Sequence, residues 1–210
     1  MTSSDAPALA VSHDEQLLRL RTLMLQGDLT PIAARRLSEK LMILAESDAY
    51  PVRLLVNSQK GCFDCAMYLY DMLQFACKQN LYTIAAGVVA GPSLLLFATP
   101  PRERRYALTY TRFSLNQSAA TSLSPEPASV SATSATGAKG SAASAGSSAA
   151  SAKLKNHMIS ILSAQTGQPM DRIEKDIQTD TWLSAKESLN YGLTGQIVVT
   201  AYEMVVPKKI

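Results

Sequence analysis

Histidine, cysteine and tryptophan are scarce in this sequence of 210 residues, which has two histidines, three cysteines and one tryptophan. Structural zinc sites usually combine two pairs of Cys or His ligands, and only one C-x-x-C motif is present, so we expect no metal and no other cofactor. The few cysteines and the lack of a secretory signal indicate a reducing compartment. No run of about 18 apolar residues occurs, so we expect no membrane-spanning helix.

A strong excess of charge is also missing. The formal net charge is +3, and no basic stripe with interleaved aromatic residues accompanies it, so we expect no nucleic-acid binding. Hydrophobic residues make up 47% of the chain, which is enough for a sizeable core. At this length we expect one domain, at residues 17–210, with a flexible segment at residues 1–16.

Short strands alternate with amphipathic helices along most of the chain, which is typical of an α/β fold with helices packed on a sheet. We expect strands at residues 22–27, 52–56, 81–86 and 196–200, and helices at residues 30–50, 66–76, 153–167, 170–176 and 184–192. Thr30 and Pro31 are typical of a helix start, and the run from Ser184 to Glu187 is a capping box.

Residues 83–98 form the centre of the predicted fold. The pattern predicts a strand that breaks at Gly87, a turn at Gly91 and an apolar helix after it. A strand that turns sharply into a buried helix is where α/β folds place nucleophiles and ligand sites. Two extended runs follow, and the second ends at Asn116.

Residues 118–152 are almost entirely Ser, Ala, Thr and Gly, with prolines near the start. Such a segment has few large side chains to bury, so it cannot offset its ordering entropy. We therefore expect a disordered insertion that interrupts the domain. Its Ala-rich end, near Lys153, is suited to extending the next helix.

Several short motifs follow one another in the order and spacing of a known family. They are Asn57-Ser58-Gln59-Lys60-Gly61, Leu69-Tyr70-Asp71-Met72-Leu73-Gln74-Phe75, Arg112-Phe113-Ser114-Leu115-Asn116-Gln117, Thr166-Gly167-Gln168-Pro169, Ile173-Glu174-Lys175-Asp176, Leu183-Ser184-Ala185 and Tyr191-Gly192-Leu193. By these motifs the chain resembles the Clp protease family, the barrel-forming serine peptidase ClpP and its relatives. The resemblance implies a ClpP/crotonase-like spiral of repeated ββα units, with the insertion in the family's handle region.

The resemblance also locates a degenerate catalytic site. The family uses a Ser-His-Asp triad with an oxyanion hole of backbone amides. Carried over by position, the nucleophile falls on Gly91, the general base on Asn116 and the acid on Asp180, and the oxyanion-loop positions fall on Gly61 and Pro92. Neither glycine nor asparagine can perform the role of its position, so the chain is expected not to be an enzyme and looks like a ClpR-type subunit.

This resemblance implies a non-catalytic structural subunit of a hetero-oligomeric ATP-dependent Clp protease, which contributes to ring assembly and the chamber wall. Its partners would be active ClpP-type and other ClpR-type subunits, an AAA+ Clp chaperone and the unfolded polypeptide in the chamber. The aromatic positions of the chaperone groove fall on Arg53 and Leu55. The expected location is the plastid stroma, with a bacterial or cyanobacterial cytoplasm as the alternative.

Two other functions stay open. One is a crotonase-like acyl-CoA enzyme, because that superfamily shares the fold and uses an oxyanion hole without a serine. The other is a thiol-regulated assembly factor, since Cys62 and Cys65 form a C-x-x-C at a predicted helix start. We favour two small apolar side chains as the interpretation of that pair.

Further candidate residues have simpler interpretations. Ser93, two positions after Gly91, is expected to be a helix serine, because no histidine is near it. His13 and His157 are expected at the surface. The basic run of Arg102, Arg104 and Arg105 is expected to be a solvated turn or to form ion pairs with a neighbouring subunit.

Overall fold

The computed structural model describes residues 12–47, 50–77, 80–115 and 142–204. The strands are β1 (Thr22–Gln26), β2 (Val52–Ser58), β3 (Leu81–Ala90), β4 (Arg105–Leu108), β5 (Arg112–Ser114), β6 (Trp182–Ser184) and β7 (Gln196–Val198). The helices are α1 (His13–Arg19), α2 (Pro31–Ser47), α3 (Phe63–Cys77), α4 (Ser93–Phe97), α5 (Ala142–Thr166), α6 (Met170–Gln178) and α7 (Ala185–Tyr191). Two short 3-10 turns, η1 (Arg102–Arg104) and η2 (Ala201–Glu203), complete the set.

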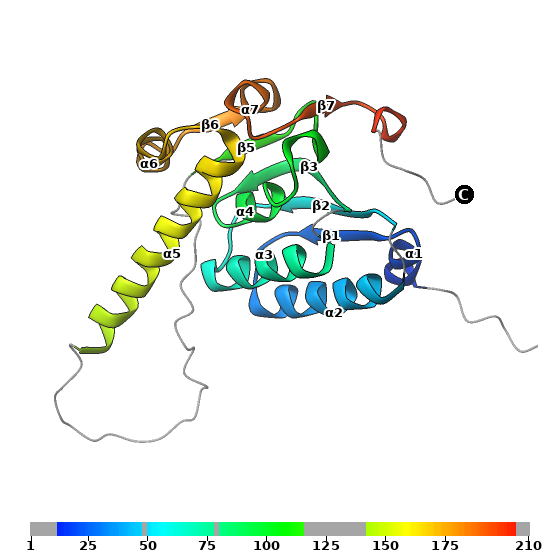
Figure 1. The fold of residues 1–210 in the computed structure, drawn as a ribbon, viewed down its shortest axis with the longest axis horizontal. Coiled ribbons are helices and arrows are strands. Elements are labelled where there is room, and N and C mark those ends of the chain that lie inside the picture. Colours follow the sequence, from blue (N-terminus) through cyan, green and yellow to red (C-terminus); the bar gives the residue numbers. More distant parts are fainter. Residues whose placement is uncertain (1–11, 48–49, 78–79, 116–141, 205–210) are drawn as a thin grey trace, which may run out of the picture.

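A parallel sheet forms the centre of the molecule, in the strand order β1-β2-β3-β4-β7 (Figure 1). β5 pairs with the far end of β3, and β6 pairs with β5 in the antiparallel direction. The predicted α/β class is confirmed. The sequence did not predict β6, because its three residues are too few to show a periodic pattern.

β3 does not break at Gly87, so the predicted end of this strand at residue 86 is wrong. The strand continues to Ala90, and Gly87 adopts a φ of 74° within it. Before Gly87 the strand pairs with β4, and after Gly87 it pairs with β5. A glycine supplies the bend because it adopts positive φ without a steric penalty. β3 thereby pairs with both β4 and β5, and β5 lies beside the C-terminal end of β3.

α2 and α3 lie side by side on one face of the sheet (Figure 1). α2 begins as predicted, because the Thr30 hydroxyl accepts the Ala33 N–H at 3.2 Å. Both helices bury residues at helical spacing, among them Leu37, Leu41 and Leu44 on α2. These side chains join the main core with the inward-facing residues of β1, β2 and β3.

The other face of the sheet carries a smaller apolar cluster. Side chains alternate along β3, so Tyr82 and Ile84 point away from the helices that cover Leu81 and Ala85. Tyr106 and Val198 complete this outer cluster. The Tyr82 and Tyr106 rings stack with their centroids 6.4 Å apart.

Two helices begin earlier than the sequence indicates. α1 begins at His13, within the segment expected to be flexible, because Ser12 and Glu15 form a reciprocal capping box. α5 begins at Ala142, within the expected insertion, as the high helix propensity of alanine allows. Residues 118–141 lie outside the described residues. The far end of α5 extends away from the sheet (Figure 1), and in the described part of the chain no helix has the length and apolarity to cross a membrane.

Candidate functional site

The backbone brings the ends of β3, β5 and the loop before β6 together. The Gly91 N–H, directly after β3, donates to the Ser114 carbonyl at 3.1 Å. The Leu115 N–H donates to the Thr181 carbonyl at 3.2 Å, which holds the loop with Asp180 beside the end of β5. Asn116 lies just outside the described residues. Of the three positions carried over from the triad, Gly91 and Asp180 therefore adjoin the same strand, β5.

Gly91 forms the sharp turn between β3 and α4. It is buried and has a φ of 58°, a backbone conformation that glycine adopts without strain. A strand-to-helix turn of this kind presents a nucleophilic side chain in hydrolases. Here the turn has no side chain to present, so it cannot form a covalent acyl intermediate.

Pro92, the next residue, changes the backbone donors at this turn. In strand-to-helix nucleophile turns, the residue after the nucleophile supplies a backbone N–H to the oxyanion hole. Proline has no N–H, so this donor does not exist at position 92 of the chain. The sequence reasoning named the position but missed this consequence, although the proline itself was the signal.

The second oxyanion-loop position, Gly61, is packed against the chain after β1. The Leu29 N–H donates to the Lys60 carbonyl, and the Leu29 carbonyl accepts from the Cys62 N–H. A Cβ atom at Gly61 would lie 2.7 Å from the Leu29 Cβ, so no larger residue fits there without movement. Leu29 thus holds the loop backbone on either side of Gly61, at Lys60 and at Cys62.

Asn57 holds this loop to the bend in β3. Its Oδ1 accepts the Val88 N–H at 3.2 Å, one residue after Gly87. The Ser58 hydroxyl donates to the Lys60 carbonyl at 3.2 Å. The family-like loop therefore keeps its position next to β3 although Gln59 and Lys60 differ from the family pattern.

Ser93 is engaged by the backbone and does not face a base. Its side chain is buried, its hydroxyl lies 2.8 Å from the Ala90 carbonyl and 3.0 Å from the Ser58 carbonyl, and its oxygen accepts the Ala90 N–H. The two histidines of the chain are exposed, His13 on α1 and His157 on α5. The geometry supports the interpretation of Ser93 as a structural helix serine.

Asp180 is exposed at the turn between α6 and β6, with a φ of 52°. A catalytic aspartate of a triad is buried and bonded to its histidine. Asp180 therefore lacks the burial that the aspartate of a working triad has. Among the described residues, no group of His, Cys, Asp and Glu side chains is placed to hold a metal ion.

The prediction of a solvated turn is wrong for one residue of the basic run: Arg102 is exposed, but Arg105 is not. This side chain is buried, and its guanidinium donates to the carbonyls of Pro100, Gln165 and Leu193 and to the Gln165 side-chain oxygen. Burial lowers the pKa of Arg105 to about 10. Arg102 donates to the Leu189 and Thr194 carbonyls. These arginines bind the C-terminal segments of their own chain.

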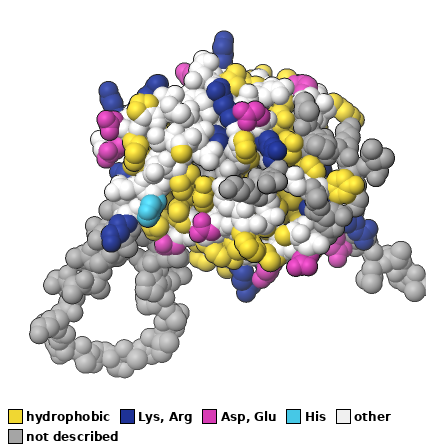
Figure 2. Space-filling model, viewed as in Figure 1, with side chains coloured by type: hydrophobic (Ala, Val, Ile, Leu, Met, Phe, Trp, Pro, Cys, Tyr) yellow, Lys and Arg dark blue, Asp and Glu magenta, His cyan; other side chains and the backbone are white. Residues whose placement is uncertain are grey.

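The expected chaperone groove has a mixed character. Arg53 donates to the Leu20 carbonyl at 2.8 Å, whereas Leu55 packs against the outer cluster. That cluster contains the stacked rings of Tyr82 and Tyr106, which are both buried and which the sequence reasoning did not assign to this face. The face seen in Figure 2 mixes hydrophobic, basic and acidic side chains, without one extended patch of a single charge.

Comparison with known proteins gives one consistent result. Residues 8–201 match the family model described as Clp protease. The chain is 30% identical over 193 residues to the ATP-dependent Clp protease proteolytic subunit 3 of Rhizobium johnstonii, with 91% of each protein covered. It is 31% identical over 197 residues to the protein of the same name from Rhizobium meliloti, with 93% and 92% covered.

The fold agrees with these sequence matches. ClpP1 from Listeria monocytogenes superimposes with a TM-score of 0.71, covering 90% of this chain and 97% of that one, at 21% sequence identity. The predicted ClpP-like arrangement is therefore confirmed.

Proposed function

The chain belongs to the Clp protease family, and from this premise we propose that it is a non-catalytic subunit of a mixed Clp proteolytic complex. Its role is to complete the ring and the chamber wall beside subunits that carry a Ser-His-Asp triad. Related proteins are named proteolytic subunits, so a loss of catalysis would be a specialisation within the family.

One observation carries this proposal: the turn after β3 reads Gly91-Pro92. Acyl transfer needs a side-chain nucleophile and preorganised donors for the oxyanion. The glycine removes the first, and the proline removes one of the donors. The same proline counts against crotonase-like acyl-CoA chemistry, because that chemistry also relies on an oxyanion hole.

The preserved backbone supports a structural role. Hydrogen bonds still join the end of β3 to β5, and β5 to the loop before β6. The backbone of the site is therefore held in place without the side chains of a catalytic triad. A subunit that only lines a chamber needs this shape so that its neighbours fit beside it. We propose active Clp-type subunits, other degenerate subunits and an AAA+ chaperone as partners, with unfolded polypeptide passing through the chamber.

Exposed apolar side chains on α2 and α3 add support for assembly. They are Ile32, Ile43, Tyr68 and Phe75, and Figure 2 shows hydrophobic side chains along its lower edge, over these helices. Grouped exposed apolar residues mark interaction surfaces more often than isolated ones do. We propose the plastid stroma as the location, on the ClpR-type character and the Ser/Ala-rich composition of residues 118–152, with a bacterial or cyanobacterial cytoplasm as the alternative.

The test is purification of the tagged chain from its native source, followed by native mass measurement and labelling with a fluorophosphonate, which reacts with activated serines. We expect a complex of several hundred kilodaltons in which partner subunits are labelled and this chain is not. A labelled chain would contradict the proposal. A chain that runs alone and turns over acyl-CoA would contradict it as well.

A further inference from the structure

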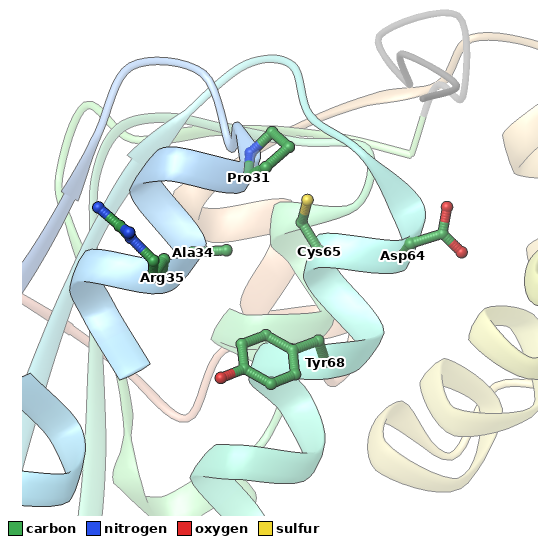
Figure 3. Close-up of a pocket in the computed structure, with 6 residues that line it drawn as sticks. All are labelled: Pro31, Ala34, Arg35, Asp64, Cys65 and Tyr68. Atoms are coloured by element: carbon green, nitrogen blue, oxygen red, sulfur yellow. The ribbon is translucent and has the colours of Figure 1, made fainter. Parts of the chain in front are cut away.

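A pocket of about 330 Å³ lies between the first turns of α2 and α3, away from the turn at Gly91. Its lining residues are Pro31, Ala34 and Arg35 from α2 and Asp64, Cys65 and Tyr68 from α3. Figure 3 shows the Tyr68 ring directed toward α2 and the Asp64 carboxylate directed away from it. The one thiol that lines this pocket is Cys65.

A second thiol lies directly behind the first. Cys62 precedes α3, and its sulfur accepts the Cys65 N–H at 3.4 Å, as a helix-capping acceptor does. The Cys62 thiol itself donates to the Asp64 carboxylate at 3.9 Å. Helix neighbours three apart have Cβ atoms about 5–6 Å apart, whereas a disulfide needs about 3.5–4.5 Å. Closing a disulfide between this pair therefore requires the segment before α3 to move by about 1–2 Å.

The two thiols differ in access. Both side chains are buried, and of the two only Cys65 lines the pocket. A small disulfide that enters the pocket meets the Cys65 sulfur first. Arg35 is the cation among the lining residues, and it is only loosely paired with Glu39, at 3.6 Å on the exposed face of α2. Asp64 is the anion among the lining residues, and its carboxylate is directed away from α2, so the Arg35 side of the pocket favours a molecule that carries a carboxylate.

We propose that Cys65 exchanges with a low-molecular-weight, carboxylate-bearing disulfide, and that Cys62 resolves the product into an internal disulfide. In the first step the Cys65 thiolate attacks one sulfur of the disulfide, and the released half leaves as a thiolate that takes up a proton. In the second step the Cys62 sulfur attacks Cys65, and the other half leaves in the same way. The chain loses two hydrogens, and the small disulfide is reduced to two thiols.

This inference does not depend on the chain being a ring subunit. It concerns the outer side of α2 and α3, and it would hold for a catalytic or a non-catalytic member of the family. It replaces the simpler interpretation of the C-x-x-C as two inert apolar side chains.

Oxidised glutathione, a tripeptide disulfide with free carboxylates, is the probe for the test. The folded full-length chain is incubated with it, the remaining thiols are alkylated, and the peptides are mapped by mass spectrometry. We expect an internal disulfide between Cys62 and Cys65 in the natural chain. In Cys62→Ser we expect a mixed disulfide with glutathione to accumulate on Cys65. In Cys65→Ser we expect no modification of Cys62.

Cys77 is the internal control, because it is buried at the other end of α3 and does not line the pocket. Its modification at the same rate as Cys65 would show that the probe reacts through unfolding, and this would overturn the proposal. An unmodified Cys65 in both the natural chain and Cys62→Ser would overturn it too.

Arg35→Gln tests the choice of a carboxylate-bearing disulfide, with Arg36→Gln as the matched control on the same helix. We expect Arg35→Gln to slow the reaction with oxidised glutathione by about two- to five-fold, the range of an exposed charge interaction. The reaction with neutral 2-hydroxyethyl disulfide should keep its rate. Equal rates for Arg35→Gln and Arg36→Gln with glutathione would overturn the assignment of ligand class.

Discussion

In the proposed non-catalytic role, Gly91 and Pro92 account for the loss of catalysis in different ways, and only one of them is a side-chain loss. A missing nucleophile can be restored by one substitution, but the missing amide of Pro92 cannot be restored while the proline is there. The two changes can therefore be separated by experiment.

We predict that the double variant Gly91→Ser, Asn116→His gains little reactivity toward a fluorophosphonate. Adding Pro92→Met should raise the labelling rate by about 100-fold or more, the usual effect of one oxyanion-hole donor. Labelling is measured by intact mass over time, with Ser93→Ala in the triple variant as the control that should not change the rate. Equal labelling of the double and triple variants would show that the amide of residue 92 is not part of the site.

The chemistry of Cys65 also depends on its surroundings. Burial, the hydrogen bond to Cys62 and the nearby Cys62 and Asp64 groups raise the pKa of Cys65 to about 12. Arg35 is the opposite charge at the pocket, and Tyr68 is the other ionisable group there. The thiol is thus almost entirely protonated at neutral pH.

We predict that exchange at Cys65 in Cys62→Ser is slow at pH 7 and accelerates by about tenfold per pH unit, because the thiolate fraction grows by that factor below the pKa. Cys62→Ser removes the contributions of Cys62 but keeps burial, the largest cause of the raised pKa of Cys65, so the rate should still rise above about pH 8.5, where an unperturbed cysteine levels off. The measurement is the rate of mixed-disulfide formation with glutathione between pH 7 and 10. A plateau near pH 8.5 would contradict the buried environment.

Arg105 shows why some of the fold could not be predicted from the sequence. Between Arg104 and Tyr106, an arginine after a proline-rich turn is typical of a solvated loop. Its acceptors at Gln165 and Leu193 are 60 and 88 residues further along the chain. No local pattern connects positions at such separations, so the burial of this charge became visible only in the structure.

We predict that Arg105→Met lowers the free energy of unfolding by about 3 kcal/mol, because three buried carbonyls lose their donor. Arg112→Met is the control. Arg112 is exposed and stacks on the Trp182 ring at 5.2 Å, an interaction that contributes about 0.5–1 kcal/mol. Urea unfolding followed by circular dichroism measures both. Similar losses for the two variants would mean that the buried donor network contributes little.

At the scale of elements, the bend in β3 organises the site. Strands and helices with a regular apolar period were predicted well, because burial on one face imposes that period. The continuation of β3 past Gly87 was not predicted, since a glycine in a strand pattern equally indicates a break. α5 begins at Ala142, earlier than the predicted residue 153, because a segment of small residues shows no apolar periodicity.

We predict that Gly87→Ala destabilises the chain by about 2 kcal/mol. A positive φ costs a non-glycine residue about 1 kcal/mol. The new Cβ would also lie 2.8 Å from the Asn57 Oδ1, so this side chain must move and give up its hydrogen bond to Val88, which costs about 1 kcal/mol more.

Gly27→Ala separates the two contributions. Gly27 has a φ of 82°, and nothing lies within 4 Å of a Cβ placed there, so only the backbone penalty of about 1 kcal/mol should be measured by urea unfolding. In an Asn57→Ala background, the cost of Gly87→Ala should fall to the same value. An undiminished cost there would show that Asn57 does not hold the bend.

At the scale of the whole molecule, the two faces of the sheet carry different apolar clusters. α2 and α3 cover one face and form the main core, while the outer cluster around Tyr82 and Tyr106 leaves the other face partly apolar. Sequence reasoning predicted the family, because the motifs are local, and the positions that it assigned to the site stay a prediction. It did not predict the outer cluster, which draws residues from β2, β3, β4 and β7.

If the chain contributes to the chamber wall but has no catalytic site, all peptidase activity of a mixed complex must come from its partner subunits. We predict that replacing the nucleophilic serine of the active partner by alanine removes the peptidase activity of the reconstituted complex down to the uncatalysed background, with the native mass unchanged. The residual activity cannot come from this chain, because its turn after β3 offers neither a nucleophile nor the amide of residue 92. Activity that persists and is lost only when this chain is left out would place a working site in it, whereas a loss of mass along with activity would place the assembly contacts at the partner's serine.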